Sequence, residues 1–475
     1  MEKYAFADWH VHPNLKTFGH TFDSTVSDKS DLWRYRKPSA VSKLLNRLFG
    51  LTRMYQSTFS SMNLAGVKIA FVSLYPFEKG FFVNKQYCGP KTAFFADLIT
   101  GIGYRRIRHL QKQDNYFEEL KAEYEFVLSA DKERKISGRD YRWKIVEDWV
   151  GIRQILDDKN ILGVIPTIEG SHVFNSGLGE YGKPTCAAEV MNNILELKKW
   201  KHPPFFITFG HNFGNDFCGH APSLEKLGPL VNQSHQCQEG FTPLGWDVVD
   251  SLLSDKNGRP ILLDLKHMSL NSRKQLYEWN KRRSEGMSPL IVSHGAVTGG
   301  SWNVTKKTGR AIFCPDEINF YDEDILEVVR SGGFFALQLD ANRLGISKVI
   351  RKPLLSSGRA RLTHSCRIIW AHLRHIAELL DREGLPAWDH IGIGSDFDGT
   401  INPLDEIWTS EDFPSMAACL LKEIEAYLDS PNSLKMLTNK FAEPKEVLSK
   451  FLIENTLRFL ERNFKEKTTL MSYAD

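Results

Sequence analysis

The sequence predicts a (β/α)₈ barrel, in the α/β class, with helical insertions and additional C-terminal helices. Eight short apolar runs are separated by longer amphipathic segments, and the runs show little alternation of apolar and polar residues. Such runs are typical of parallel strands buried on both faces, and repeated strand–helix alternation is the pattern of this barrel. The expected strands are Tyr4–His10, Gly66–Tyr75, Ile161–Ile168, Pro204–Phe209, Ile261–Leu265, Pro289–Ser293, Gly333–Leu339 and His390–Ser395.

The segments between and after these runs predict helices that surround the barrel. The clearest are Trp246–Leu253, Ser272–Arg283, Glu323–Ser331, Ile368–Arg382, Met416–Leu428 and Lys445–Phe464. We interpret residues 1–475 as a single barrel domain with insertions at about 13–65 and 76–160. The second insertion is expected to hold helices at Tyr104–Lys135 and Tyr141–Asp157, and its phenylalanines form either a lid over the site or a packed insertion.

Composition places the chain among ordinary soluble globular proteins, with 42% apolar and 25% charged residues. Its 61 Lys or Arg and 58 Asp or Glu give a net charge of +3, too weak to recruit nucleic acid or an anionic membrane by charge alone. The seven cysteines are scattered, which fits a reducing compartment rather than a disulfide framework. No signal peptide or apolar stretch of about 18 residues is recognisable. We therefore expect a cytoplasmic protein that binds neither nucleic acid nor membrane, with a homodimer as one option.

Histidine or acidic residues follow six of the eight expected strands. The active site of an α/β barrel lies at the C-terminal ends of its strands, so these side chains are expected to meet there. Loop residues that serve only solubility would favour Lys, Ser and Gly at these positions. The residues concerned are His10, His12, Glu169, His211, His267, His294, Asp396 and Asp398.

A metal site is the interpretation that best accounts for the set. His10 and His12 are two residues apart on a strand, so they face the same side. Imidazole and carboxylate ligands suit zinc, and four histidines with one glutamate provide for one or two divalent cations. The predicted ligands are His10, His12, Glu169, His267 and His294.

The remaining polar residues suggest the chemistry. Glu169 has two oxygens and can bridge two cations, which then share a hydroxide and polarise a substrate carbonyl. Asp396 is left to take and return the proton, whereas Asp398 is equally well explained as a turn residue. His211 either donates to the developing oxyanion or is packed beside Asn212.

These motifs together resemble the membrane (renal) dipeptidase family of the amidohydrolase superfamily, whose members are binuclear zinc (β/α)₈ enzymes. The resemblance runs from residue 6 to about 464. Its most specific segment is Gly392-Ile393-Gly394-Ser395-Asp396-Phe397-Asp398-Gly399. The resemblance implies that the first metal is held by His10, His12 and Glu169, and the second by Glu169, His267 and His294. It also implies that His211 contacts the substrate carbonyl and that Asp396 handles the proton.

Two departures from the family bear on metal and substrate. The family commonly has Asp where this chain has His12, and it has an Arg-Asn pair where this chain has Trp302-Asn303. The family's Arg binds the terminal carboxylate of the substrate, a task that an indole cannot perform. Either Arg310 takes over, or the pocket is apolar and the substrate carries an aromatic, esterified or amidated group. The expected substrate contacts are therefore His211, Trp302, Asn303 and Arg310.

We therefore predict a metal-dependent, dipeptidase-like hydrolase, a metallopeptidase with two Zn²⁺ per chain or other divalent metals in their place. It is expected to cleave the amide bond of a dipeptide or related small amide through a metal-bridging hydroxide, with Asp396, His211 and Glu169 as catalytic residues. The alternatives are an amidohydrolase-type lactonase or phosphoesterase and a non-catalytic barrel binding protein. A phosphoesterase would bring more cations to the mouth than Lys266 and Arg310.

Overall fold

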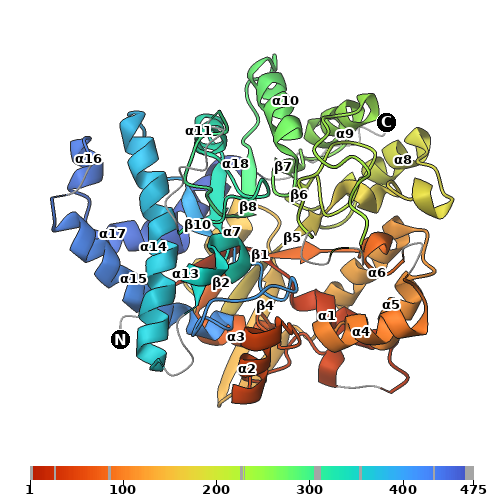
Figure 1. The fold of residues 1–475 in the computed structure, drawn as a ribbon, viewed down its shortest axis with the longest axis horizontal. Helices are drawn as coiled ribbons and strands as arrows, with labels where there is room; N and C mark the ends of the chain where they lie inside the picture. The colour runs from red at the N-terminus through yellow and green to blue at the C-terminus, as the bar shows by residue number, and fades with distance from the viewer. Residues whose placement is uncertain are drawn as a thin grey trace, which may run out of the picture.

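Eight parallel strands close into a barrel in the computed structural model of the chain, and helices surround them (Figure 1). The structure describes residues 4–25, 28–83, 87–224, 228, 231–303, 312–351, 356–431 and 434–465. Pairing of β2 with β5 and of β10 with β1 closes the ring. The barrel strands are β1 (Phe6–Val11), β2 (Val67–Leu74), β5 (Ile161–Glu169), β6 (Phe206–Thr208), β7 (Leu262–Asp264), β8 (Ile291–Gly295), β9 (Phe334–Leu337) and β10 (Ile391–Ile393). Each predicted strand is present, and the predicted fold class is confirmed.

Aromatic side chains fill the barrel below the polar strand ends. The ring of Trp9 stacks on those of Phe71 and Phe334, with centroids 4.4 and 4.1 Å away, and Phe206 lies 6.1 Å away. These rings come from β1, β2, β9 and β6, so they meet in the barrel interior. The indole Nε1 of Trp9 donates a hydrogen bond of 2.8 Å to Thr456 Oγ1, which satisfies its one buried donor. This layer forms a rigid floor for the site above it.

The helices predicted around the barrel are confirmed, several with longer bounds. They are α9 (Pro243–Leu253), α10 (Leu270–Lys281), α11 (Asp322–Arg330), α14 (Gly358–Arg382) and α15 (Phe413–Leu428), joined by α8 (Ala187–Lys198). Each buries one apolar face, as Ile369, Ile376 and Leu380 of α14 illustrate with 0% exposure.

Two insertions extend the barrel. The first follows β1 and contains α1 (Pro13–Gly19), α2 (Ala40–Phe49) and α3 (Phe59–Ala65). The second follows β2 and contains α4 (Pro90–Thr100), α5 (Tyr104–Leu110), α6 (Tyr116–Ser129), strands β3 (Glu133–Ile136) and β4 (Arg139–Ile145), and α7 (Trp149–Leu156).

The helix predicted over Tyr141–Asp157 is wrong in its first part. Residues 139–145 form β4, which pairs antiparallel with β3 and parallel with the start of β5. Tyr141 and Trp143 are buried while Arg142 and Lys144 are exposed, an alternation of period two that fits a strand and not a helix. The helix predicted over Tyr104–Lys135 is likewise divided into α5, α6 and the start of β3.

The C-terminal helices close the opposite end of the barrel from the site. The helix predicted over Lys445–Phe464 consists of α17 (Pro444–Ser449), a π-helical turn η8 (Lys450–Glu454) and α18 (Asn455–Asn463). Its apolar side chains Leu448, Leu452 and Leu460 are buried, and the ring of Phe459 lies 5.2 Å from that of Trp9.

Shorter helices connect these elements. They are α12 (Ala341–Leu344), α13 (Ser347–Ile350) and α16 (Leu437–Lys440), with 3₁₀ turns at His20–Phe22, Asp28–Ser30, Lys79–Phe81, Ser171–Phe174, Gly179–Tyr181 and Ser410–Asp412. Among the described residues, no helix combines the length and the apolar character that crossing a bilayer requires.

Candidate metal and active site

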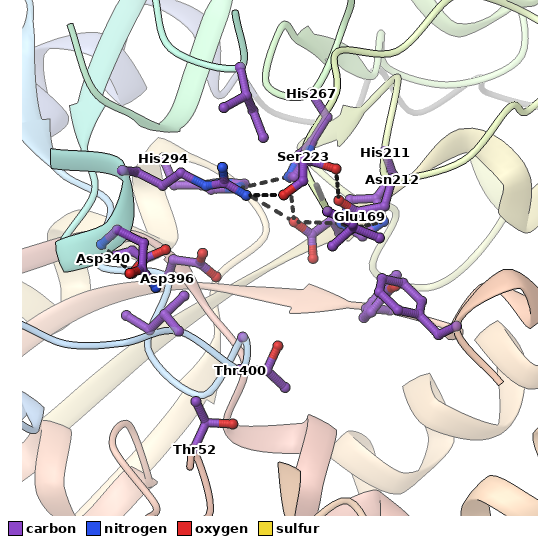
Figure 2. A pocket seen from close by; sticks show the side chains of 18 of the residues that line it. Thr52, Glu169, His211, Asn212, Ser223, His267, His294, Asp340, Asp396 and Thr400 are labelled. Carbon is purple, nitrogen blue, oxygen red and sulfur yellow. Dashed lines mark hydrogen bonds and ion pairs between the residues drawn. The ribbon is translucent and has the colours of Figure 1, made fainter. Parts of the chain in front are cut away.

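The polar residues that follow the barrel strands meet at one mouth of the barrel, in a cavity of about 420 Å³. Figure 2 shows Glu169, His211, His267 and Asp396 directed toward this cavity from different strands. Glu169 is the last residue of β5, while His211, His267 and Asp396 each follow their strand by three residues. The structure therefore brings together, at one end of the barrel, residues that are far apart in the sequence.

Five imidazoles surround the carboxylate of Glu169. The Nε2 atoms of His10, His211 and His294 lie 3.4, 3.5 and 3.5 Å from Oε1 of Glu169. His12 Nε2 lies 3.2 Å from Oε2, and His267 Nε2 lies 3.7 Å from Oε1. All six side chains are at most 9% exposed, so the cluster is buried. This convergence is what a shared metal-ligating carboxylate requires.

A buried hydrogen-bond network fixes which ring nitrogens face Glu169. The hydroxyl of Ser293 donates to Asp264 Oδ2 at 2.6 Å, which uses its only proton. Its oxygen must therefore accept from the Nδ1 atoms of His10 and His294, at 3.2 and 2.8 Å. Both rings then present an unprotonated Nε2 to the centre of the site, which is the tautomer that binds a metal.

The protonation of these rings agrees with that assignment. Burial lowers the pKa of His10, His267 and His294, so the rings are neutral at physiological pH. Neutral lone pairs crowded around one carboxylate repel each other unless a cation lies between them. The ligand atoms of His10, His12 and Glu169 lie within 4.8 Å of one another. Those of Glu169, His267 and His294 are separated by 3.4–3.7 Å. The residues therefore fit divalent cations, and imidazole with carboxylate favours zinc.

Left-handed backbone at two positions turns the side chains into the cavity. His267 has φ of 67° and Asp396 has φ of 60°, both unusual for residues other than glycine. Asp396 N donates to His10 O at 2.9 Å, and Ala221 N donates to His267 O at 2.8 Å. These contacts hold strained conformations that place functional groups, a common use of strain at active sites.

Asp396 lies beside the histidine cluster with its Oδ1 atom 3.8 Å from His12 Nε2. The carboxylate of Asp8 supports the preceding residue, accepting from Ser395 N at 2.8 Å and Ser395 Oγ at 2.6 Å. Burial, and then the charge of Glu169, raises the pKa of Asp396 well above its usual value. A carboxylate with a raised pKa is suited to accepting a proton near neutral pH.

Asp398, two residues later, has a structural role. Lys16 Nζ donates to its Oδ1 at 2.9 Å, and the backbone N–H groups of Gln56 and Ser57 donate to its Oδ2 at 2.9 and 2.8 Å. It ties the first insertion to β10 and is 1% exposed, so it does more than terminate a turn.

His211 has a partner that the sequence did not reveal. Both oxygens of Glu78, in the loop after β2, lie 2.8 Å from His211 Nδ1. Burial lowers the pKa of His211, but Glu78 and Glu169 outweigh it and raise the pKa to about 10. Burial raises the pKa of Glu78, but His211 and His172 lower it to about 2. The two residues form an ion pair, and nothing in the Pro-Phe-Glu-Lys segment of the sequence marks Glu78 for it.

Two cations also line the cavity. Lys266, which precedes His267, is 1% exposed, and its Nζ has no hydrogen-bond partner among the described residues. Burial and then the charge of Arg343 lower its pKa to about 7. Arg343 of α12 donates to Ser223 O at 2.8 Å and lines the same cavity. Sequence reasoning missed Arg343 because it lies on a short helix after β9, away from any recognised motif.

The predicted substrate residues around Trp302 lie elsewhere. Trp302 stacks on Tyr277 of α10 with centroids 6.3 Å apart, and Lys274 Nζ lies 4.8 Å above its ring. Its neighbour Asn303 is exposed. Neither residue is among those that line the cavity. Arg310 lies outside the described residues.

Comparison with known proteins supports the fold. No family model matches the sequence. The structure is similar to that of dipeptidase AC, a metallopeptidase of family M19, with a TM-score of 0.55, 16% identity and coverage of 98% of this chain and 100% of that one. It is also similar to a metallopeptidase from Rhodobacter sphaeroides bound to a phosphinate mimic of the dipeptide L-Ala-D-Ala, with a TM-score of 0.53, 16% identity and coverage of 97% and 100%. The chain therefore has the (β/α)₈ barrel fold of these metallopeptidases.

Proposed function

We propose that the chain is a metal-dependent hydrolase that cleaves the amide bond of a dipeptide or related small amide. The observation that carries this proposal is the convergence of five imidazole Nε2 atoms within 3.2–3.7 Å of one buried carboxylate, at the mouth of the barrel. The shared fold with two metallopeptidases supports it.

In this proposal, His10, His12 and Glu169 would bind the first metal, and Glu169, His267 and His294 would bind the second. These residues would hold two divalent cations, which would supply Lewis acidity toward a carbonyl oxygen and an activated water as nucleophile. We propose that the metal is zinc, that two ions bind per chain and would share a hydroxide, and that the chain is located in the cytoplasm. The Ser293–Asp264 network supports it because it orients one ligand of each metal.

His211 and Asp396 then handle the substrate's charge and proton. The ion pair with Glu78 keeps His211 protonated, so its Nε2–H can donate to the carbonyl oxygen as negative charge develops there. Asp396 lies on the opposite side of Glu169, next to His12, where it can take a proton from water and return it to the leaving amine.

The charge of the cavity supports a small zwitterionic substrate. Lys266 and Arg343 can bind a carboxylate, while Asp340, Asp316 and Glu317, which also line the cavity, can bind an ammonium group. A free dipeptide carries both groups. Since Trp302 contacts α10 and not the cavity, the apolar pocket considered from the sequence has no support from the described residues. Carboxylates outnumber cations among the residues that line the cavity. This disfavours a phosphoester as substrate, because its phosphate would need more cations.

Metal content and hydrolysis measured on the same preparation test this proposal. The purified chain, reconstituted with Zn²⁺, is expected to hold two metal ions and to hydrolyse members of a library of L- and D-dipeptides. Glu169→Gln should lose both properties, whereas the control Glu278→Gln, on the exposed face of α10, should lose neither. A chain that binds no divalent metal after reconstitution would refute the proposal. Metal binding without amide hydrolysis would favour a lactonase or a binding protein.

A further inference from the structure

The exposed apolar side chains of the described residues are concentrated on one part of the chain. Of fifteen large apolar side chains that are exposed, twelve lie between residues 35 and 104. Nine of them belong to two helices, and we call their surface the α2–α4 face. Its residues are Val41, Leu44, Leu45, Leu48, Phe49, Phe94, Phe95, Leu98 and Ile99. Monomeric proteins rarely leave such patches uncovered without a binding role.

The two helices form one continuous surface because their C-terminal ends meet. Thr52 N donates to Ile99 O at 3.0 Å, and Arg53 Nη1 donates to Asp97 O and Leu98 O at 2.9 and 3.0 Å. Figure 1 shows α2 and α4 along the lower edge of the molecule, away from α16. Phe49 is 69% exposed, so its ring points away from the protein.

Positive charge is concentrated on the same part of the chain. Residues 32–113 contain 14 Lys or Arg and two Asp or Glu, whereas the rest of the chain contains 47 and 56. The net charge of +3 therefore conceals a basic segment of +12 beside a remainder of −9. Arg36, Arg53, Lys91 and Arg105 are exposed, and none has an ion-pair partner within the described ranges.

We propose that the α2–α4 face docks on the surface of an anionic lipid bilayer. Amphipathic helices that combine Leu and Phe on one face with Lys and Arg beside it insert into the headgroup region, and anionic lipids strengthen the contact. A second copy of the chain fits the α2–α4 face less well as a partner. In a two-fold contact the exposed Lys and Arg side chains of one copy would lie opposite those of the other and repel them. The expectation of no membrane contact rested on the absence of a long apolar stretch and on the net charge, and the net charge averages over this asymmetry.

Docking would bring the proposed active site to the membrane. Gly50 and Thr52 after α2, and Ile99 and Thr100 of α4, line the cavity that contains Glu169. Figure 2 shows Thr52 at the side of this cavity. If the proposed amide hydrolysis holds, on which this consequence rests, the cavity would open beside the bilayer and receive substrates from the interface.

Co-sedimentation of the full-length chain with vesicles tests the docking without reference to catalysis. Wild type should bind vesicles of phosphatidylcholine containing phosphatidylglycerol, bind pure phosphatidylcholine weakly, and be released by salt. Phe49→Asp combined with Phe94→Asp should lower the partition coefficient about tenfold or more. Lys91→Glu combined with Arg105→Glu should lower it about fivefold or more per charge. The matched control is Phe441→Asp, since Phe441 is 72% exposed but lies on the far side, beyond α16.

Several results would overturn the docking. The first is a wild-type chain that does not bind anionic vesicles. The second is a loss of vesicle binding in Phe441→Asp equal to that in the Phe49→Asp and Phe94→Asp double variant. The third is a dimer in solution that Phe49→Asp dissociates. The last would identify a second copy as the occupant. Metal content and dipeptide hydrolysis in the absence of vesicles should be the same in wild type and Phe49→Asp, so failure of docking and failure of the proposed function are separable.

Discussion

Replacing Ser293 by alanine tests how the site prepares its metal ligands. The side chain is 0% exposed and is not among the residues that line the cavity, yet it links Asp264 to ligands of both proposed metals. Ser293→Ala removes the acceptor that holds the proton on Nδ1 of His10 and His294. Both rings are then free to rotate or to take the other tautomer.

The expected loss can be estimated from the contacts. Removing a hydrogen-bond partner of a metal-bound histidine typically weakens metal binding about 10–100-fold, or about 1.4–2.8 kcal/mol. Since Ser293 supports one ligand of each metal, both ions should be affected. The assay is titration of the metal-free chain with Zn²⁺ against a chromophoric chelator.

A second buried serine provides the control. Ser365 of α14 is 1% exposed and donates to Asp405 O at 2.7 Å, away from the cavity. Ser365→Ala should lose a comparable hydrogen bond and leave metal affinity unchanged. If Ser293→Ala binds both ions as tightly as wild type and Ser365→Ala do, the network does not orient the ligands and the reasoning fails.

Four further substitutions address the proton, the substrate carboxylate and the pair Trp302 and Arg310. Asp396→Asn should lower kcat about 10²-fold or more while metal content stays near that of wild type, and intact activity would restrict Asp396 to a structural role. Arg343→Met should lower kcat/KM about tenfold or more for a free dipeptide and little for its C-terminal amide; an unchanged ratio would remove Arg343 from substrate binding. Trp302→Ala should leave the ratio of kcat/KM for the free dipeptide to that for its C-terminal amide unchanged. If Arg310→Ala instead abolishes the preference for the free dipeptide, the carboxylate is bound by Arg310.

The sequence predicted the barrel well because local signals were strong. The eight strands are continuous apolar runs, and six end in His, Asp or Glu, so both the fold and the ends of the strands that form the site could be predicted. The strand β4 was missed because its alternation spans only seven residues inside a segment rich in charged residues. A short strand depends on its partners, here β3 and β5, more than on its own pattern.

The supporting residues of the site could not be predicted in this way. Glu78 pairs with His211 across 133 positions, and Ser293 contacts His10 across 283. Such contacts exist only after the barrel closes, and no spacing in the sequence encodes them. Arg343 lines the cavity and Trp302 does not, and the positions of the two residues along the chain did not indicate this difference.

The number of metal ions per chain tests the central claim most directly. The metal-free chain should be incubated with Zn²⁺, freed of excess metal, and measured by elemental analysis together with Glu169→Gln and His294→Ala. We expect two ions in wild type, loss at both positions in Glu169→Gln, and loss of mainly one ion in His294→Ala. A wild-type chain that retains no ion, or a Glu169→Gln chain that retains two, would contradict it.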